Sequence, residues 1–197
     1  AIVCLGLGYV YISRIVPTYE VSESIYLSDD KKKKKSNAVA LSANMPLIDT
    51  KDYIDETEIE ILKSRNNLIK IVDSLDLAYS YYKIGQFRDD PIYGTNVVSA
   101  RLDSISLKNL TSPIDIIVSK EDKIYTFDLT TKYGGVEEHK TIETDSLPIS
   151  VELSHGTLQL LPSRTTGLLE GKQKIVVSNP NWVAARLSSN LRIEFAR

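Results

Sequence analysis

The sequence predicts an α+β fold in which helices pack on a mixed sheet, with a β-rich antiparallel insertion and a truncated transmembrane helix at the start. Three patterns predict it: an apolar first segment, one long segment with helical spacing, and a series of short β-branched runs. The expected boundaries are residues 1–16 for the transmembrane helix, 17–110 with 172–197 for an α+β domain, and 111–171 for the insertion.

The composition of the 197 residues is that of a folded domain. Hydrophobic residues make up 42% and charged residues 25%, which excludes general disorder. A net charge of −2 argues against a nucleic-acid-binding protein, whose surface would be strongly basic. With Cys4 as its single cysteine and only two histidines, the chain has little material for a disulfide framework or a metal site. The composition therefore favours a protein that is not an enzyme.

The first 16 residues predict part of a membrane anchor. They carry no charge before Arg14, and a spanning helix needs about 20 apolar residues. Because the segment starts without Met or a flanking charge, we expect it to be the end of a longer helix, with Tyr9, Tyr11 and Arg14 at the membrane interface. A buried core helix is the alternative. Pro17 is expected to end the helix, and the remainder of the chain is expected on one side of the membrane.

Two different patterns follow Pro17. Tyr19–Leu27 largely alternates apolar and polar residues, which predicts a half-buried strand even though Glu23 falls on its apolar face. Lys31–Lys35 form a charge run of the kind usually found in solvated loops, and binding of an anionic surface or polymer is the alternative. Residues 36–50 lack clear periodicity and contain Pro46, which predicts an irregular or short helical connection.

The strongest helical pattern covers Asp55–Leu75. Its apolar residues recur at spacings of three and seven and form one stripe, made of Ile59, Leu62, Ile69, Val72 and Leu75. Acidic residues crowd its first turn, where they complement the helix dipole. A tyrosine-rich segment from Tyr79 to Tyr93 follows. We expect its rings to be partly buried, with stacking on sugars as the alternative.

From Thr111 onward, short β runs follow one another at close spacing. The predicted strands are Ile114–Val118, Ile124–Thr130, Ile149–Leu153, Thr157–Leu161 and Lys174–Val177. Turn residues separate them, so an antiparallel sheet or a small sandwich is expected. The four-residue spacing of Val183, Leu187 and Leu191 predicts an amphipathic helix over Pro180–Leu191, with a strand over Leu191–Phe195 after it.

No motif in the chain predicts a catalytic, cofactor-binding or metal-binding centre. The Gly171-Lys172 pair lacks the first Gly and the following Ser or Thr of a phosphate-binding loop, so a β-turn before a strand is expected there. His139 and His155 stand far apart in sequence and are expected in surface turns. The adjacent carboxylates are expected in solvated loops, at Asp29–Asp30, Asp89–Asp90 and Glu137–Glu138.

Three segments carry a family resemblance. An apolar helix runs into Pro17–Ile25, the second segment is Glu58–Arg65 continued by Ile71–Leu77, and the third is Pro180–Leu191 with a strand after it. In this order they resemble the extracytoplasmic domain of bacterial chain-length determinants, the Wzz-like polysaccharide co-polymerases, and of their tyrosine-kinase-fused relatives. Residues 111–171 look like an insertion found in some larger members of that family.

The resemblance implies a non-catalytic scaffold in the bacterial inner membrane, with this domain facing the periplasm. Such proteins assemble as homo-oligomers beside a polysaccharide polymerase or export channel and set the length of capsular or exopolysaccharide. In this hypothesis the apolar stripe of the Asp55–Leu75 helix packs on the sheet. Its polar side, including Lys63, Arg65 and Lys70, is then free to contact a neighbouring protomer. The insertion favours the kinase-associated subtype, whose kinase domain is not part of these residues.

Two other functions remain open from the sequence. A membrane-anchored carbohydrate-binding or adaptor module would use the β region as its face for a glycan. A periplasmic hydrolase would need a catalytic group of residues, and the sequence gives no reason to expect one. Specific glycan binding without assembly would favour the binding module over the scaffold.

Overall fold

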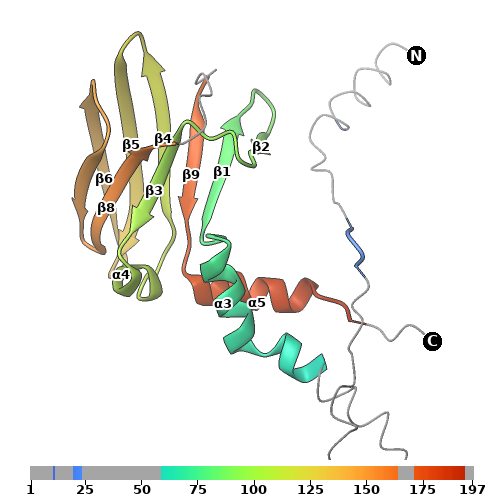
Figure 1. The fold of residues 1–197 in the computed structure, drawn as a ribbon. Coiled ribbons are helices and arrows are strands. Elements are labelled where there is room, and N and C mark those ends of the chain that lie inside the picture. The colour runs from blue at the N-terminus through green and yellow to red at the C-terminus, as the bar shows by residue number, and fades with distance from the viewer. Residues whose placement is uncertain (1–10, 12–19, 24–58, 164–170, 194–197) are drawn as a thin grey trace, which may run out of the picture. The chain divides into compact units, whose positions relative to one another are not determined.

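The computed structural model describes residues 11, 20–23, 59–163 and 171–193 (Figure 1). The chain separates into two compact units, residues 1–58 and residues 59–197. Almost all described residues belong to the second unit, so the fold is presented for that unit by itself.

The first unit contains few described residues. Tyr11 is helical, and residues 20–23 have no regular secondary structure. Val21, which the alternation predicts on the buried face of a strand, is 88% exposed. The remainder of the expected membrane helix, the Lys31–Lys35 run and the connection at 36–50 lie outside the described residues. Among the described residues, no helix has both the length and the apolar character that crossing a membrane requires.

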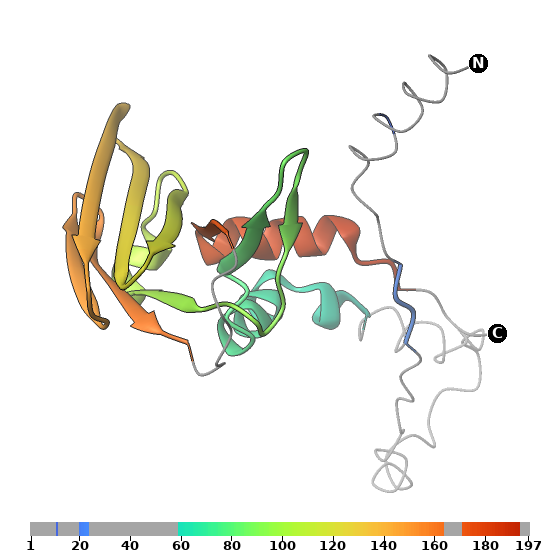
Figure 2. The same ribbon diagram turned by 90° about the horizontal axis from the view of Figure 1, so that it is seen from above.

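The second unit is α+β, as the sequence predicts (Figures 1 and 2). Its strands form a six-stranded sheet in the order β2-β1-β9-β4-β5-β6 and a three-stranded sheet in the order β3-β8-β7. The strands are β1 (Tyr79–Ile84), β2 (Asp89–Pro91), β3 (Val98–Leu102), β4 (Ile114–Glu121), β5 (Ile124–Tyr133), β6 (Val136–Thr144), β7 (Ile149–Leu153), β8 (Gly156–Pro162) and β9 (Gln173–Val177). The helices are α3 (Arg65–Ser74), α4 (Ser104–Lys108) and α5 (Pro180–Asn190), and residues 59–63 are also helical.

All strand pairings in the described part of the chain are antiparallel, so the expectation of a mixed sheet is wrong. β9 lies between β1 and β4 and runs antiparallel to both. β1 and β4 therefore point the same way, but they cannot pair because β9 separates them. Parallel neighbours usually need a long helical crossover, and here the chain makes none between paired strands.

Five of the predicted strands are confirmed, namely β4, β5, β7, β8 and β9, with boundaries that differ by at most three residues. The sheets cross the expected division into an α+β domain and an insertion. β9 comes from the part after residue 172 and pairs with β4 of the insertion, and β3 pairs with β8. Each of the two sheets therefore contains strands from the expected α+β domain and strands from the expected insertion.

Alternate residues of the central strands form the apolar core. In β4 the side chains of Ile114, Ile116 and Val118 are buried, while the residues between them are partly exposed. The other buried strand residues of the core are Phe127, Leu129, Ile175 and Val177 in the large sheet, and Val98, Ala100, Leu102, Val151, Leu153, Leu158 and Leu160 in the small one. Full burial of each large apolar side chain contributes about 1.5–3 kcal/mol.

The helix predicted over Asp55–Leu75 is interrupted at Ser64. This residue is extended, with φ −60° and ψ 139°, and it separates residues 59–63 from α3. Its hydroxyl accepts a hydrogen bond from the backbone N–H of Asn67 at 3.4 Å, and Asn67 Nδ2 donates to the Ile61 carbonyl oxygen at 2.7 Å. Ser64 is thus the N-cap of α3, a position that serine favours.

The interruption changes which side chains of α3 are buried. Leu68 and Val72 lie in the core, whereas Leu62 and Leu75 of the predicted stripe are 37% and 64% exposed. The stripe is wrong at these two positions, because Leu62 lies before the break at Ser64 and Leu75 is the C-cap that follows the last helical residue of α3. α3 packs mainly on α5, and both helices lie at the end of β1 and β9 rather than across a face of the sheet (Figures 1 and 2).

Helix α5 is confirmed close to its predicted limits, and Asn179 connects its start to α4. Asn179 is 6% exposed, and its Oδ1 accepts a hydrogen bond from the Asn181 backbone N–H at 2.9 Å, which caps the helix. Its Nδ2 donates to the carbonyl oxygens of Lys108 at 2.8 Å and Leu110 at 3.0 Å. One amide therefore closes the start of α5 and the end of α4. The strand expected over Leu191–Phe195 is absent at residues 191–193.

The turn between β7 and β8 rests on the start of α4 at Gly156, whose φ is +130°. A Cβ at this position would overlap Ser106 Oγ and lie 3.1 Å from Asp103 Oδ2. These neighbours are held in place, because Asp103 caps α4 by accepting hydrogen bonds from the N–H groups of Ile105 and Ser106, both at 3.0 Å. The hydrogen bonds from Ser106 keep the pKa of the Asp103 carboxyl below its ordinary value. Only glycine fits this close approach.

Asn179→Ala is expected to lower the free energy of unfolding by about 3 kcal/mol, because it removes the helix cap and two hydrogen bonds to carbonyl groups. Asn179→Asp keeps the cap acceptor but cannot donate to either carbonyl, so it is expected to cost at least about 2 kcal/mol. Urea unfolding followed by circular dichroism measures both. Asn190→Ala, at the exposed end of α5, is the control and should change stability by less than about 0.5 kcal/mol. A similar result for all three variants would contradict this role of Asn179.

Gly156→Ala is expected to destabilise the protein by about 2–4 kcal/mol, since backbone strain and steric overlap with Ser106 act together. Gly135→Ala is the matched control: its φ is +85°, but nothing lies within 4 Å of the added methyl group. It should show the conformational cost alone, about 1–2 kcal/mol. Thermal unfolding of the two variants gives the comparison, and equal losses would mean that the contact with α4 is unimportant.

Candidate functional site

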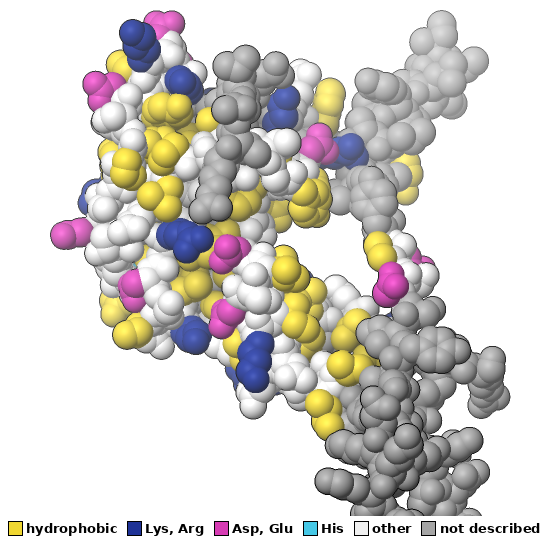
Figure 3. Space-filling view, in the orientation of Figure 1, with side chains coloured by type: hydrophobic (Ala, Val, Ile, Leu, Met, Phe, Trp, Pro, Cys, Tyr) yellow, Lys and Arg dark blue, Asp and Glu magenta, His cyan; other side chains and the backbone are white. Residues whose placement is uncertain are grey.

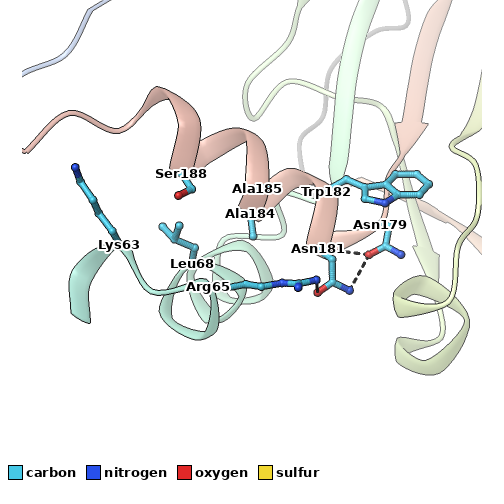
Figure 4. Close-up of a pocket in the computed structure, with 9 residues that line it drawn as sticks. All are labelled: Lys63, Arg65, Leu68, Asn179, Asn181, Trp182, Ala184, Ala185 and Ser188. Atoms are coloured by element: carbon cyan, nitrogen blue, oxygen red, sulfur yellow. Dashed lines mark hydrogen bonds between the residues drawn. The ribbon is translucent and has the colours of Figure 1, made fainter. Parts of the chain in front are cut away.

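A groove with a volume of about 580 Å³ lies between the start of α3 and α5 (Figure 4). Its lining residues are Lys63, Arg65, Leu68, Asn179, Asn181, Trp182, Ala184, Ala185 and Ser188. Lys63 and Ser188 lie toward one end, Asn179, Asn181 and Trp182 lie toward the other, and Leu68 and Ala184 lie between them (Figure 4). The volume is within the usual range for ligand sites, about 300–1,000 Å³.

A relay of amides holds Arg65 at one end of the groove. Arg65 Nη2 donates to Asn181 Oδ1 at 3.2 Å, and Asn181 Nδ2 donates to Asn179 Oδ1 at 3.1 Å. Asn179 is in turn bonded to the carbonyl oxygens of Lys108 and Leu110. The position of the guanidinium group is therefore tied to the buried part of the unit.

The two basic residues of the groove have no carboxylate partner among the residues that the structure describes. Among the described residues, no carboxylate lies within 4.0 Å of the charged nitrogens of Lys63 or Arg65, and the first turn of α3 contains no acidic residue. Some basic side chains elsewhere have acidic partners, as in the pairs Lys108–Asp73, Arg101–Asp76 and Lys174–Asp115. On the face in Figure 3, basic and acidic side chains are interspersed over the described residues. Two cations that line one groove, without a carboxylate partner in the described residues, suit it to an anionic group.

The structure separates the three basic residues that the sequence suggests as contacts between protomers. Lys63 and Arg65 line the groove, whereas Lys70 is exposed on α3 and does not. Arg65 is also hydrogen-bonded to α5 and does not stand free on a polar side. Sequence reasoning missed Asn181 and Trp182, although the latter is 44% exposed. Their only sequence signal is a position at the start of an amphipathic helix, which does not reveal what they face.

The tyrosine-rich segment has a structural role in β1. The Tyr79 hydroxyl accepts a hydrogen bond from the Leu102 N–H at 3.0 Å and donates to the Leu102 carbonyl oxygen at 3.4 Å. The Tyr81 hydroxyl interacts with the backbone of Ala100 and the side chain of Ser99. Both tyrosines thereby join the large sheet to β3 of the small sheet. The expectation of partly buried rings is confirmed for these two, whereas Tyr93 is 87% exposed.

The other candidate residues of the sequence have ordinary structural places. His155 lies in the β7–β8 turn, as expected, and its Nε2–H donates to the Lys132 carbonyl oxygen at 3.0 Å. His139 lies in strand β6 and not in a turn, where it shares a 3.0 Å hydrogen bond with the Thr130 hydroxyl. Two of the three carboxylate pairs are also in strands rather than loops, Asp89–Asp90 in β2 and Glu137–Glu138 in β6, while Asp29–Asp30 lies outside the described residues. Pairing with one neighbouring strand is enough to place these polar residues in a sheet.

Neither a metal site nor a phosphate loop is found in the described part of the chain. No three His, Cys, Asp or Glu side chains come together there in a group that could hold a metal ion. The Gly171-Lys172 pair directly precedes β9, so the expected strand after it is confirmed, while residues 164–170, which the expected turn would include, lie outside the described residues.

Comparisons with known proteins found no match: no family model, no curated protein and no solved structure matches this chain. The groove between α3 and α5 is accordingly the candidate site on its geometry and charge alone.

The two tyrosines of β1 predict a loss of stability at high pH. Burial raises the pKa of Tyr79 and of Tyr81 above the ordinary value of 10.0, with hydrogen bonds to β3 acting in the opposite direction. Since the folded state holds these protons more tightly, their contribution is complete below pH 10.0 and is lost as the pH rises above it.

We therefore expect the free energy of unfolding to fall above about pH 10, and to fall less steeply in the double variant Tyr79→Phe/Tyr81→Phe. Urea unfolding at a series of pH values measures the slopes. Tyr93→Phe, at an exposed position, is the control and should keep the slope of the wild type. An unchanged slope in the double variant would refute the assignment.

Proposed function

We propose that this chain is the extracytoplasmic domain of an inner-membrane polysaccharide co-polymerase, which regulates the chain length and export of capsular or exopolysaccharide by oligomeric scaffolding. In this proposal, residues 1–16 belong to the membrane anchor, and the domain faces the periplasm beside the polymerase or export channel. In this proposal the segment acts through its shape and its assembly and does not catalyse a reaction. A fused tyrosine kinase belongs to the same proposal and is not part of these residues.

The observation that carries the proposal is the contact between two of the three segments that resemble the family. Glu58–Arg65 and Ile71–Leu77 contain the first residue and the last turn of α3, and Pro180–Leu191 contains α5. The two helices pack together, their buried residues belong to one apolar cluster, and Arg65 is hydrogen-bonded to Asn181 across 116 positions of sequence. Segments that resemble one family in order along the chain are thus also one unit in space. A common origin with that family explains this contact better than unrelated local similarities do.

The proposal is tested by deleting the gene in its native host and restoring it. We expect deletion to change the length distribution of the surface polysaccharide on gels while the sugar composition stays the same, because a scaffold affects the number of repeats and not their chemistry. Restoring the wild-type gene should return the original distribution. A restored Asn179→Asp variant should shift the distribution in the direction of the deletion but by less, because a loss of about 2 kcal/mol lowers the amount of folded protein without abolishing the fold.

An unchanged length distribution after deletion would contradict the co-polymerase. If the purified chain then binds glycans on an array, the membrane-anchored carbohydrate-binding or adaptor module becomes the better function. The two readouts are independent, since one measures polymer length in cells and the other measures binding to an isolated protein.

A further inference from the structure

We propose that the groove between α3 and α5 binds an acidic saccharide segment, with the carboxylate of one sugar unit held by the Arg65 guanidinium. The inference rests on the proposed function, because it names the chemical class of polymer that this domain would contact. It concerns residues that the sequence resemblance associates with contacts between protomers and gives them a different role.

The first argument is that Arg65 is arranged in advance for a planar anion. A guanidinium has five N–H donors, and the Asn181 amide uses only one nitrogen of Arg65. The other donors are left for a carboxylate, which pairs with arginine through two parallel hydrogen bonds. Since the relay through Asn181 and Asn179 already fixes the side chain, binding costs less conformational entropy than at a freely rotating arginine.

The second argument is the charge at the two ends of the groove. Lys63 lies toward the end opposite to Asn181, and neither it nor Arg65 has an acidic partner among the described residues (Figure 4). A ligand with acidic groups at intervals along its length would meet a cation at each end. An extended acidic polymer fits this arrangement better than a single small anion does.

The third argument is the chemistry of the surface between these ends. Leu68 and Ala184, which are 4% and 1% exposed, form the buried floor of the groove, and the small side chain of the exposed Ala185 leaves room above it for the flat face of a sugar ring. The Ser188 hydroxyl and the Asn181 amide can exchange hydrogen bonds with sugar hydroxyl groups. The exposed indole of Trp182 borders the Arg65 end and offers an aromatic surface where a polymer leaves the groove (Figure 4).

An acidic peptide fits the groove less well than a saccharide. Peptides usually bind by adding a strand to a sheet edge or by burying several large apolar side chains. Helices α3 and α5 line this groove and offer no strand edge, and Leu68 is the only large aliphatic residue in its lining. The lining offers mainly amide, hydroxyl and cationic groups, which recognise hydroxyl-rich and carboxylate-bearing ligands.

The test is calorimetric titration of the whole 197-residue chain with tetragalacturonate as the acidic probe. We expect binding that Arg65→Gln weakens about tenfold, the effect of losing a charged hydrogen bond. Lys70→Gln is the matched control, because it removes the same charge from the same helix outside the groove, and it should change affinity less than about twofold. Ala185→Phe fills the groove from an exposed position, keeps the Arg65–Asn181 bond, and should also abolish binding.

Three results would overturn the inference: no binding of tetragalacturonate, equal weakening by Arg65→Gln and Lys70→Gln, or equally tight binding of neutral maltotetraose. Equal affinity for a hexaglutamate peptide would also overturn it, since the groove would then be a general anion site. Urea unfolding of each variant identifies any that fail to fold. If deletion changes polymer length in cells but these titrations are negative, only the groove assignment fails and the co-polymerase proposal stands.

Discussion

The side-chain amide of Asn179 is the interaction on which the helical end of the second unit depends. It stabilises the first turn of α5, it binds the two carbonyl groups that follow α4, and it orients Asn181 toward Arg65. A buried amide is stabilising only when its donors and acceptors are all used, and in the described residues no buried side-chain nitrogen or oxygen is left without a partner. The same buried side chain bonds to the end of α4, the start of α5 and Asn181. The position of Arg65 at the groove is therefore fixed by contacts with the core.

A second set of polar contacts joins the two sheets along β3. The hydroxyls of Tyr79 and Tyr81 reach this strand from β1, and Gln173 at the start of β9 accepts a hydrogen bond from the Val97 N–H at 3.3 Å. β3 is an edge strand of the small sheet, so its outer backbone groups need partners or water. Side chains of the large sheet provide these partners and protect the edge.

Both sets of polar contacts join elements that lie far apart in the sequence. Two of the three segments that carry the resemblance to chain-length determinants contribute to α3 and α5, and the groove lies between these two helices. Lys70, exposed on α3 outside the groove, remains a candidate for contacts between protomers, while Arg65 has a partner within its own chain. Arg65 and Lys70 therefore differ in their contacts because Arg65 faces α5 and Lys70 does not.

The sequence by itself determined the α+β class, five strands and helix α5, because apolar alternation and helical spacing are local patterns that burial enforces. It could not reveal β6, since both faces of that strand are largely exposed and show no alternation. It also missed β1, whose tyrosines find their partners on β3 more than fifteen residues away. Only the tertiary structure decided that α3 starts at Ser64, that β9 enters between β1 and β4, and that Arg65 meets Asn181. These features depend on free energies of contact between distant segments, which no window of neighbouring residues contains.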